Sequence, residues 1–340
     1  MKKYLLPESG NFYKANLHCH STVSDGWLTP EELKERYMSL GYSVVAFSDH
    51  DVMVPHPELK DENFLPLTAI EYDVANPDSS SPRGETCHFN FIALDEKMDT
   101  QILWHRDKYI PKHTLHSKEL VKFDDTLPDY EREYTPECIS DMMTKGREAN
   151  FFVTYNHPAW SYETYPEYIN YNGMHAMEIM NNLSVVGRGI FDYNDIIYDE
   201  MLRAGKRIFC IAADDTHAKY PMGSRKCDIG GAYTMIKADK LDYKSIADSL
   251  KNGNFYSSEG PEIKSLWYED GKLCIECAPA DSIIFTTYPK RGEAFFAENG
   301  ELLTYGEFTV RETDKYIRVT VVSENGKRAY TNAYFTDELL

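Results

Sequence analysis

Residues 43–51 read Ser-Val-Val-Ala-Phe-Ser-Asp-His-Asp, an unbroken apolar run followed at once by a cluster of ionisable side chains. A short apolar run without polar alternation is typical of a strand buried on both faces of a sheet. Other extended stretches also lead into, or carry, histidines and acids, namely His18 and His20, Asp25, Glu71, His88, Asn156 and His157, and Asp215 and His217. We expect these side chains to lie at or just after strand ends and to converge at one edge of a sheet.

Helical patterns separate several of the predicted strands. Thr29 precedes Pro30 and two acidic residues, which predicts an N-cap and a first helical turn, and Gly41 ends this helix. Further helices are predicted over 136–149, 194–205 and 241–253. The alternation of strands and helices predicts an α/β protein with a mostly parallel barrel or sheet.

Two regions depart from this alternation. Residues 95–135 are polar and aromatic without a clear period, and we expect an insertion that caps the barrel mouth. Beyond Pro261, short alternating segments are separated by Asp-Gly and Asn-Gly pairs, which are typical of β-hairpins. The predicted organisation is therefore a barrel over 1–260, with 95–135 as its insertion, and a small β-sandwich subdomain over 261–340 whose expected role is structural.

Composition excludes some classes of partner. The 340-residue chain has a net charge of −19, which counts against a protein that grips long nucleic acid through a basic face. No segment approaches the ~20 apolar residues of a membrane span, and the N-terminus has no signal-peptide pattern. Seven cysteines without a secretion signal indicate reduced thiols, so we expect a cytoplasmic protein and no membrane partner.

The histidines and acids at the strand ends predict a metal site. Six of the 11 histidines belong to this set. Residues i and i+2 of a strand point to the same side, so His18 can converge with His20 and Asp215 with His217. Imidazoles and carboxylates that meet at one point are typical metal ligands. Asp49 and Asp214 fall out of this register, and we expect each to orient a neighbour instead.

These motifs resemble those of the PHP (polymerase and histidinol phosphatase) metal-dependent phosphoesterases. The resemblance covers residues 14–217 and rests on His18-x-His20, Ser48-Asp-His-Asp51, Asn156-His-Pro158 and Asp215-x-His217 in that order, with Glu71 and His88 between them. It implies a distorted (β/α)7 TIM-like barrel with two or three divalent metal ions at its mouth. The C-terminal region resembles the β-rich tail of some single-chain members.

The resemblance also implies how the ligands divide among the ions. His18, His20, Glu71 and Asp215 would hold one ion, and Glu71 would bridge to a second ion held by His88 and His157. Asp25, His50 and His217 would hold a third ion. A metal-bound hydroxide held by Glu71, His88 and His157 would be the nucleophile. Some members carry His where this chain has Asp25, and the carboxylate favours manganese, magnesium or iron over zinc.

Phosphate binding is expected to need a cation besides the metals. Arg188, flanked by glycines, and Arg225 follow two of the predicted strands and are the candidate substrate-binding residues. The predicted function is hydrolysis of a small phosphomonoester or nucleotide. The alternatives are a short-oligonucleotide exonuclease or nucleoside bisphosphate phosphatase, and an inactive barrel that serves as a binding module. The sequence leaves the oligomeric state open.

Overall fold

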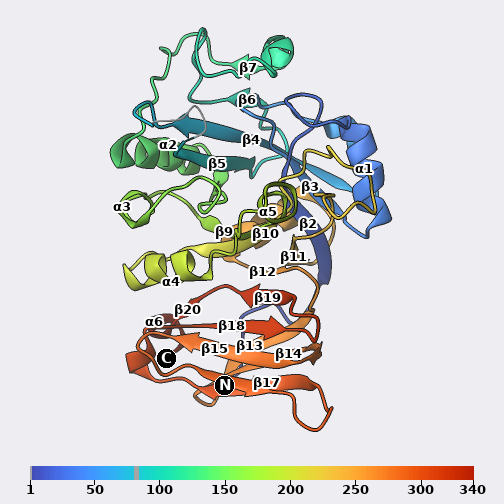
Figure 1. Ribbon diagram of the computed structural model, residues 1–340, viewed down its shortest axis with the longest axis vertical. Coiled ribbons are helices and arrows are strands. Elements are labelled where there is room, and N and C mark those ends of the chain that lie inside the picture. The colour runs from blue at the N-terminus through green and yellow to red at the C-terminus, as the bar shows by residue number, and fades with distance from the viewer. Residues whose placement is uncertain (1, 80–83) are drawn as a thin grey trace.

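The computed structural model describes residues 2–79 and 84–340, and it is a mixed α/β structure built on one large sheet. Figure 1 shows helices α1 to α5 in the upper part and a β-rich layer with α6 in the lower part, where the N- and C-termini both lie. The strand path of the large sheet, in spatial order, is β10 (Phe209–Ala213), β9 (Ala176–Asn181), β8 (Phe151–Tyr155), β5 (Thr86–Ala93), β4 (Leu65–Ala75), β3 (Val44–Phe47), β2 (Asn11–Cys19), β11 (Tyr233–Ala238), β12 (Phe255–Ser258), β19 (Arg328–Thr331), β18 (Tyr316–Val322), β15 (Ser282–Thr287) and β16 (Glu293–Phe296), with β20 (Tyr334–Phe335) paired to β18.

From β10 to β12 the large sheet has four parallel and four antiparallel strand pairs, so it is mixed and not mostly parallel as predicted. Pairs β10–β9, β9–β8, β4–β3 and β3–β2 are parallel, whereas β5 is antiparallel to both its neighbours and β11 is antiparallel to β2. The start of β5 therefore lies at the same edge as the ends of β4 and β8. The expectation that His88 follows or ends an apolar stretch is wrong, because His88 stands near the start of a reversed strand.

Glu71 also sits differently from the prediction. It does not follow its strand but lies inside β4, which continues to Ala75. β4 pairs with β3 only as far as Thr68, and beyond that point a single parallel bridge joins Glu71 to His50. β4 is longer than β3, and its extension places Glu71 beside His50, which follows the end of β3.

The sheet curls, and a single parallel bridge joins Cys19, at the end of β2, to Thr216 beyond β10. After β10 the chain returns to β2, where the N–H of His20 donates to the carbonyl of Thr216 at 2.8 Å. The Thr234 hydroxyl of β11 donates to the carbonyl of Ala212 in β10 at 3.1 Å. These contacts bring β10, which begins the strand path, close to β2 and β11 in the middle of the path. A closed barrel remains a prediction.

The helices begin and end where capping predicts. α1 (Pro30–Ser39) has a Thr29–Glu32 capping box, and α5 (Tyr243–Asn252) starts after Asp242 and ends at Gly253 with φ +68°. A left-handed φ of this kind favours glycine at a helix end. The remaining helices are α2 (Pro136–Glu148), α3 (Tyr165–Tyr168), α4 (Asp195–Arg203) and α6 (Thr336–Leu339), with short helical turns η1 (Pro57–Leu59), η2 (Leu115–Leu120), η3 (Ser184–Arg188) and η4 (Glu312–Asp314). Among the described residues, no helix has the length and apolar character needed to cross a membrane.

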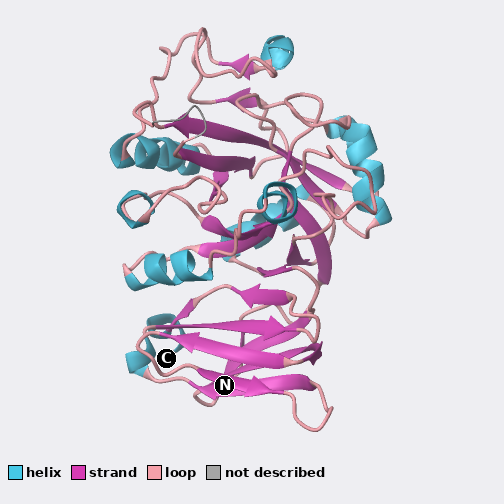
Figure 2. Cartoon of the chain, viewed as in Figure 1, coloured by secondary structure: helices cyan, strands magenta, loops and turns pink. Residues whose placement is uncertain are grey.

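A second sheet of four strands faces the C-terminal strands of the large sheet (Figure 2). Its strands, in spatial order, are β1 (Lys3–Tyr4), β13 (Ile263–Glu269), β14 (Lys272–Ala280) and β17 (Leu303–Thr309). Buried apolar side chains from both sheets, Leu266 and Ile275 among them with Ile283 and Val319, form one core. The N-terminal residues of β1 therefore pack with the C-terminal region, and the large sheet runs continuously through both regions.

Candidate metal centre

The carboxylate of Glu71 lies at the centre of a cluster of histidine and acidic side chains at one edge of the large sheet. Its Oε1 lies 3.2 Å from His18 Nε2, from His88 Nδ1 and from His157 Nε2. Its Oε2 lies 3.3 Å from His20 Nε2 and 3.2 Å from His50 Nδ1. The carboxylate is 1% exposed. One buried carboxylate therefore faces five imidazoles. His18 and His88 lie on β2 and β5, whereas His20, His50 and His157 lie just after the ends of β2, β3 and β8.

Asp215 and Asp25 complete the cluster on either side of this carboxylate. Asp215 Oδ1 lies 3.1 Å from His20 Nε2 and 3.3 Å from His18 Nε2. Asp25 Oδ1 lies 3.0 Å from His217 Nε2 and 3.8 Å from His50 Nε2. The His20 ring links the two sides, because its centroid is 4.3 Å from the centroids of both His50 and His217.

The nine predicted ligands fall into four overlapping groups of side chains that can hold a metal ion. In the described part of the chain these groups contain all nine residues and no other: His20, Asp25, His50 and His217; His18, His20 and Asp215; His18, Glu71 and His157; and His50, Glu71 and His88. The division differs from the one that the resemblance implies, since His157 joins His18 and His88 joins His50. Shared members mean that neighbouring ions would be close together.

The donor set fits divalent cations. Ligand atoms about 2.1 Å from a common ion lie roughly 3 Å from one another, which is the spacing between most of these atoms. Four buried polar atoms of the cluster also have no hydrogen-bond partner: His20 Nδ1, Asp25 Oδ1, Glu71 Oε2 and His88 Nδ1. Buried polar groups normally have hydrogen-bond partners, so these four atoms are candidates for binding a metal ion instead.

The pKa values of the cluster residues also fit a site for divalent cations. Burial disfavours a charge on His20, but the nearby carboxylates of Asp215 and Glu71 outweigh burial and raise its pKa to about 9. Burial, reinforced by the charge on His20, lowers the pKa of His50 to about 3. Burial opposes ionisation of Glu71 too, yet His18 and His88 hold its pKa well below the ordinary value. Without cations, protons on histidines balance the carboxylates, and bound metal would displace those protons.

The second ring nitrogen of several histidines has its own partner. His18 Nδ1 lies 2.7 Å from Glu178 Oε1, and His88 Nε2 lies 3.3 Å from Asp73 Oδ1. His157 Nδ1 lies 3.3 Å from the hydroxyl oxygen of Ser161. Such contacts fix the tautomer that leaves the other nitrogen free to ligate a metal.

Glu178 is a residue that the sequence argument missed. It is fully buried in β9, and its Oε2 accepts hydrogen bonds from the N–H of His157 and from Asn181 Nδ2, both at 2.9 Å. Its carboxylate therefore positions His18 and His157 together. The available signal was a lone acid inside the otherwise apolar strand Ala176–Asn181.

Three further acids shape the loops that carry the ligands. Asp49 accepts hydrogen bonds from the N–H groups of Ser21 and Ser24, which build the turn leading to Asp25. Asp214 accepts from the N–H groups of Gly230, Gly231 and Ala232, and Asp228 accepts from those of His217 and Ala218. Asp49 and Asp214 thus orient neighbours, as the sequence register predicts.

Residues 95–135 pack against the rim of the cluster. Gln101, in β6 (Thr100–Gln101), donates to the carbonyl of Asp51 at 3.0 Å, and Arg132 Nη1 donates to Asp51 Oδ1 at 2.5 Å. The ring of His113 lies 5.9 Å from the ring of His50. β6 pairs with β7 (Lys122–Phe123), and together they lie above β4 in Figure 1.

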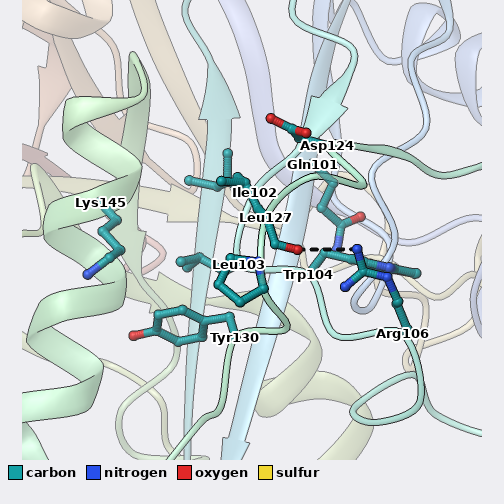
Figure 3. A pocket seen from close by; sticks show the side chains of 10 residues that line it. Gln101, Ile102, Leu103, Trp104, Arg106, Asp124, Leu127, Tyr130 and Lys145 are labelled. Carbon is teal, nitrogen blue, oxygen red and sulfur yellow. Dashed lines mark hydrogen bonds between the residues drawn. The ribbon is translucent and has the colours of Figure 1, made fainter.

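A cavity of about 310 Å³ lies within this same region (Figure 3). Leu103, Trp104, Leu127 and Tyr130 line it, and Lys145 of α2 stands at its edge. Arg106 Nη2 donates to the carbonyl of Leu127 at 3.2 Å across one side of it. None of the nine cluster residues lines this cavity, so the chemistry belongs to the cluster and not to the cavity.

The two arginines proposed as phosphate ligands lie apart from the cluster contacts. Arg188, at the end of η3, and Arg225, in the loop after His217, are exposed, and neither has a hydrogen bond or ion pair with a cluster residue in the described structure. Two other residues approach the ligands instead. Lys219 Nζ lies 3.4 Å from Asp25 Oδ2, and the half-buried Trp160 ring lies 4.8 Å from the ring of His157.

Comparisons with known proteins give one short sequence match and distant structural likenesses. No family model matches the chain. A 40-residue stretch is 52% identical to a 5'-3' exoribonuclease of Haemophilus influenzae, which spans 12% of this chain and only 15% of that protein.

Among solved structures, a two-domain protein from Bacteroides vulgatus, described as containing a predicted PHP-like metal-dependent phosphoesterase, is 14% identical over 98% of both chains with a TM-score of 0.45. A protein from Bifidobacterium adolescentis described as a metal-dependent phosphoesterase is 15% identical, over 64% of this chain and 91% of that one, with a TM-score of 0.39. An amidohydrolase from Chromobacterium violaceum is 14% identical, over 60% of this chain and 88% of that one, with a TM-score of 0.39. All three TM-scores are below 0.5, so these likenesses carry no conclusion about the function of this chain.

Proposed function

We propose that this protein is a metal-dependent hydrolase of phosphate esters that acts on a small phosphomonoester or nucleotide. The observation that carries the proposal is the convergence of five imidazoles on the buried carboxylate of Glu71, flanked by Asp215 and Asp25. The nine cluster residues would hold two or three divalent cations. Asp25 adds an oxygen donor that favours manganese, magnesium or iron over zinc.

The chemistry of the donor set suits phosphate ester hydrolysis. Divalent cations about 4 Å apart activate water near neutral pH and offset the negative charge that builds up on phosphorus-bound oxygens. Glu71 would be shared between ions, since its two oxygens face different histidines. His88 and His157 would each help to hold a cation that Glu71 also binds, and Glu178 would keep His157 in place through its backbone N–H.

The proposed division of the chain places the metal cluster in a barrel domain. The curled upper part of the large sheet would correspond to a distorted (β/α)7 barrel over 1–260, with the cluster at its mouth. The facing sheets of 261–340 would form the small β-sandwich subdomain, and 95–135 would cap the site. Contacts of Gln101 and Arg132 with Asp51, next to His50, support this placement of the cap.

The test is hydrolysis by metal-stripped protein to which manganese, iron, magnesium or zinc is returned. Phosphate release from an aryl phosphate and a nucleotide panel should depend on the added metal. His157→Ala should abolish it while the circular dichroism spectrum is retained. His56→Ala, outside the cluster, should behave as the wild type. Metal-bound protein that hydrolyses no panel member would favour the inactive binding module, and equal hydrolysis by His157→Ala would refute the site.

A second candidate is cleavage of short oligonucleotides or of a nucleoside bisphosphate. The 40-residue match to an exoribonuclease favours it, while the net charge of −19 counts against long polymers. Product analysis separates the candidates. Inorganic phosphate released from a nucleoside monophosphate supports a phosphomonoesterase. Phosphate released from a nucleoside bisphosphate and not from a monophosphate supports a bisphosphate phosphatase, and mononucleotides released from a short RNA support an exonuclease.

A further inference from the structure

Among the described residues, the cluster is most exposed on the side of Asp25 and His50. The side chains of His18 and Glu71 are 0% and 1% exposed, whereas those of His50 and Asp25 are 14% and 23% exposed. Lys219, which lies beside Asp25, is 33% exposed. The open side of the cluster is therefore the one that carries Asp25 and His50, and Lys219 lies beside it.

The Lys219 ammonium is only loosely engaged by its partner. Its Nζ lies 3.4 Å from Asp25 Oδ2, while the other lysine–carboxylate ion pairs of the described residues are 2.8 Å or shorter. Charge-assisted N–H···O bonds are usually about 2.7–2.9 Å long. An ammonium carries three donors, so Lys219 keeps donors for a further anionic partner.

The backbone that carries Lys219 is held firmly. Asp228 accepts hydrogen bonds from the N–H of His217 at 2.8 Å and from the N–H of Ala218 at 3.1 Å. On the other side, the N–H of Trp27 donates to the carbonyl of His217 at 2.9 Å. Preorganisation of this kind lowers the entropic cost of binding a ligand.

The arginines of the region do not offer the same contact. Arg188 and Arg225 are exposed and have no described contact with the cluster. The Arg132 side chain is 3% exposed, and its Nη1 donates both to Asp51 Oδ1 at 2.5 Å and to the Asp73 carbonyl at 3.1 Å. In the described chain, Lys219 is the one lysine or arginine with an ion pair to a cluster carboxylate.

We infer that Lys219 binds a phosphoryl oxygen of the substrate and thereby serves as a substrate-binding residue of the site. The inference rests on the proposed function and deepens it. The phosphate would sit on the open side, with one oxygen towards the Lys219 ammonium and others towards the cations held by Asp25, His50 and His217. The purely structural reading is that Lys219 only neutralises Asp25, and the two readings predict different results.

The experiment measures inorganic phosphate binding to metal-loaded protein by calorimetry, with the metal content of every sample determined. Lys219→Met should weaken phosphate binding about 10- to 100-fold, the effect of losing a charged hydrogen bond, with no loss of metal. Lys219→Arg should recover part of that loss. Lys226→Met is the matched control, because Lys226 is exposed in the same loop and faces the Tyr220 ring.

Three results would overturn the inference. Unchanged phosphate affinity in Lys219→Met would exclude a direct contact, and a loss of phosphate binding that follows a loss of metal would leave only the structural reading. In both cases metal-dependent hydrolysis by the wild type would stand, so the proposed function would survive. Wild-type protein that holds metal but neither binds phosphate nor hydrolyses an ester would refute both proposals.

Discussion

Replacing Glu178 by glutamine should weaken metal binding although Glu178 belongs to none of the four groups of candidate ligands. The carboxylate is fully buried, with Oε1 at 2.7 Å from His18 Nδ1 and Oε2 accepting from the N–H of His157 and from Asn181. Both oxygens therefore face donors. A glutamine has one carbonyl oxygen, so its NH₂ group must face at least one of these donors.

The magnitude follows from these contacts. Loss of the carboxylate partner of a ligating histidine typically costs 10- to 100-fold in metal affinity, or about 1.4–2.8 kcal/mol. Because Glu178 serves both His18 and His157, we expect the upper part of this range. The assay is titration of metal-stripped protein with manganese or zinc against a chromophoric chelator.

The matched control for this variant is Glu163→Gln. Glu163 is also a buried carboxylate, and it accepts hydrogen bonds from the Tyr155 hydroxyl at 2.6 Å and from the Tyr134 hydroxyl at 3.0 Å, apart from the metal cluster. It should bind metal as the wild type does. Equal metal affinity in wild type, Glu178→Gln and Glu163→Gln would refute the reasoning that Glu178 positions the ligands.

Three further outcomes are expected. Metal affinity should rise with pH up to about 9, because protons on histidines such as His20 compete with the metal; calorimetry in two buffers of different ionisation enthalpy should detect proton release, and its absence would count against the cluster as the metal site. Burial raises the pKa of Glu163 from 4.5 to about 7, so the folded state holds this proton more tightly than the unfolded state, and the free energy of unfolding should fall between those pH values by up to about 3 kcal/mol. Urea denaturation at pH 5 and pH 8 should show this loss in the wild type and little of it in Glu163→Gln. Gly26→Ala would place a Cβ 2.4 Å from the His20 carbonyl oxygen, which should destabilise the fold by about 1–3 kcal/mol and displace Asp25; an unchanged melting temperature and metal content would contradict this.

Local signals in the sequence were enough to predict much of the site. Spacing of two within a strand brings His18 and His20 onto one side, and both face Glu71 and Asp215. Capping residues marked the start of α1 and the end of α5. The mixed α/β class is confirmed, and the nine predicted ligands lie together in one cluster.

The remaining features depend on contacts between distant residues. The reversal of β5, which turns the start of a strand towards the site, depends on its pairing with β4 and β8. Glu178 meets His18 across 160 residues of sequence, and Lys219 meets Asp25 across 194 residues. No local pattern encodes these distances, so the supporting acid and the cation of the open side emerge only from the folded structure.

The most direct test of the account is a crystal structure of manganese-soaked protein with anomalous diffraction measured at the manganese edge. We predict two or three strong anomalous peaks, about 4 Å apart, within the groups that share Glu71 and His20. Peaks elsewhere on the molecule, or none within the cluster from protein that carries manganese in solution, would contradict the central claim that these nine residues form a metal centre.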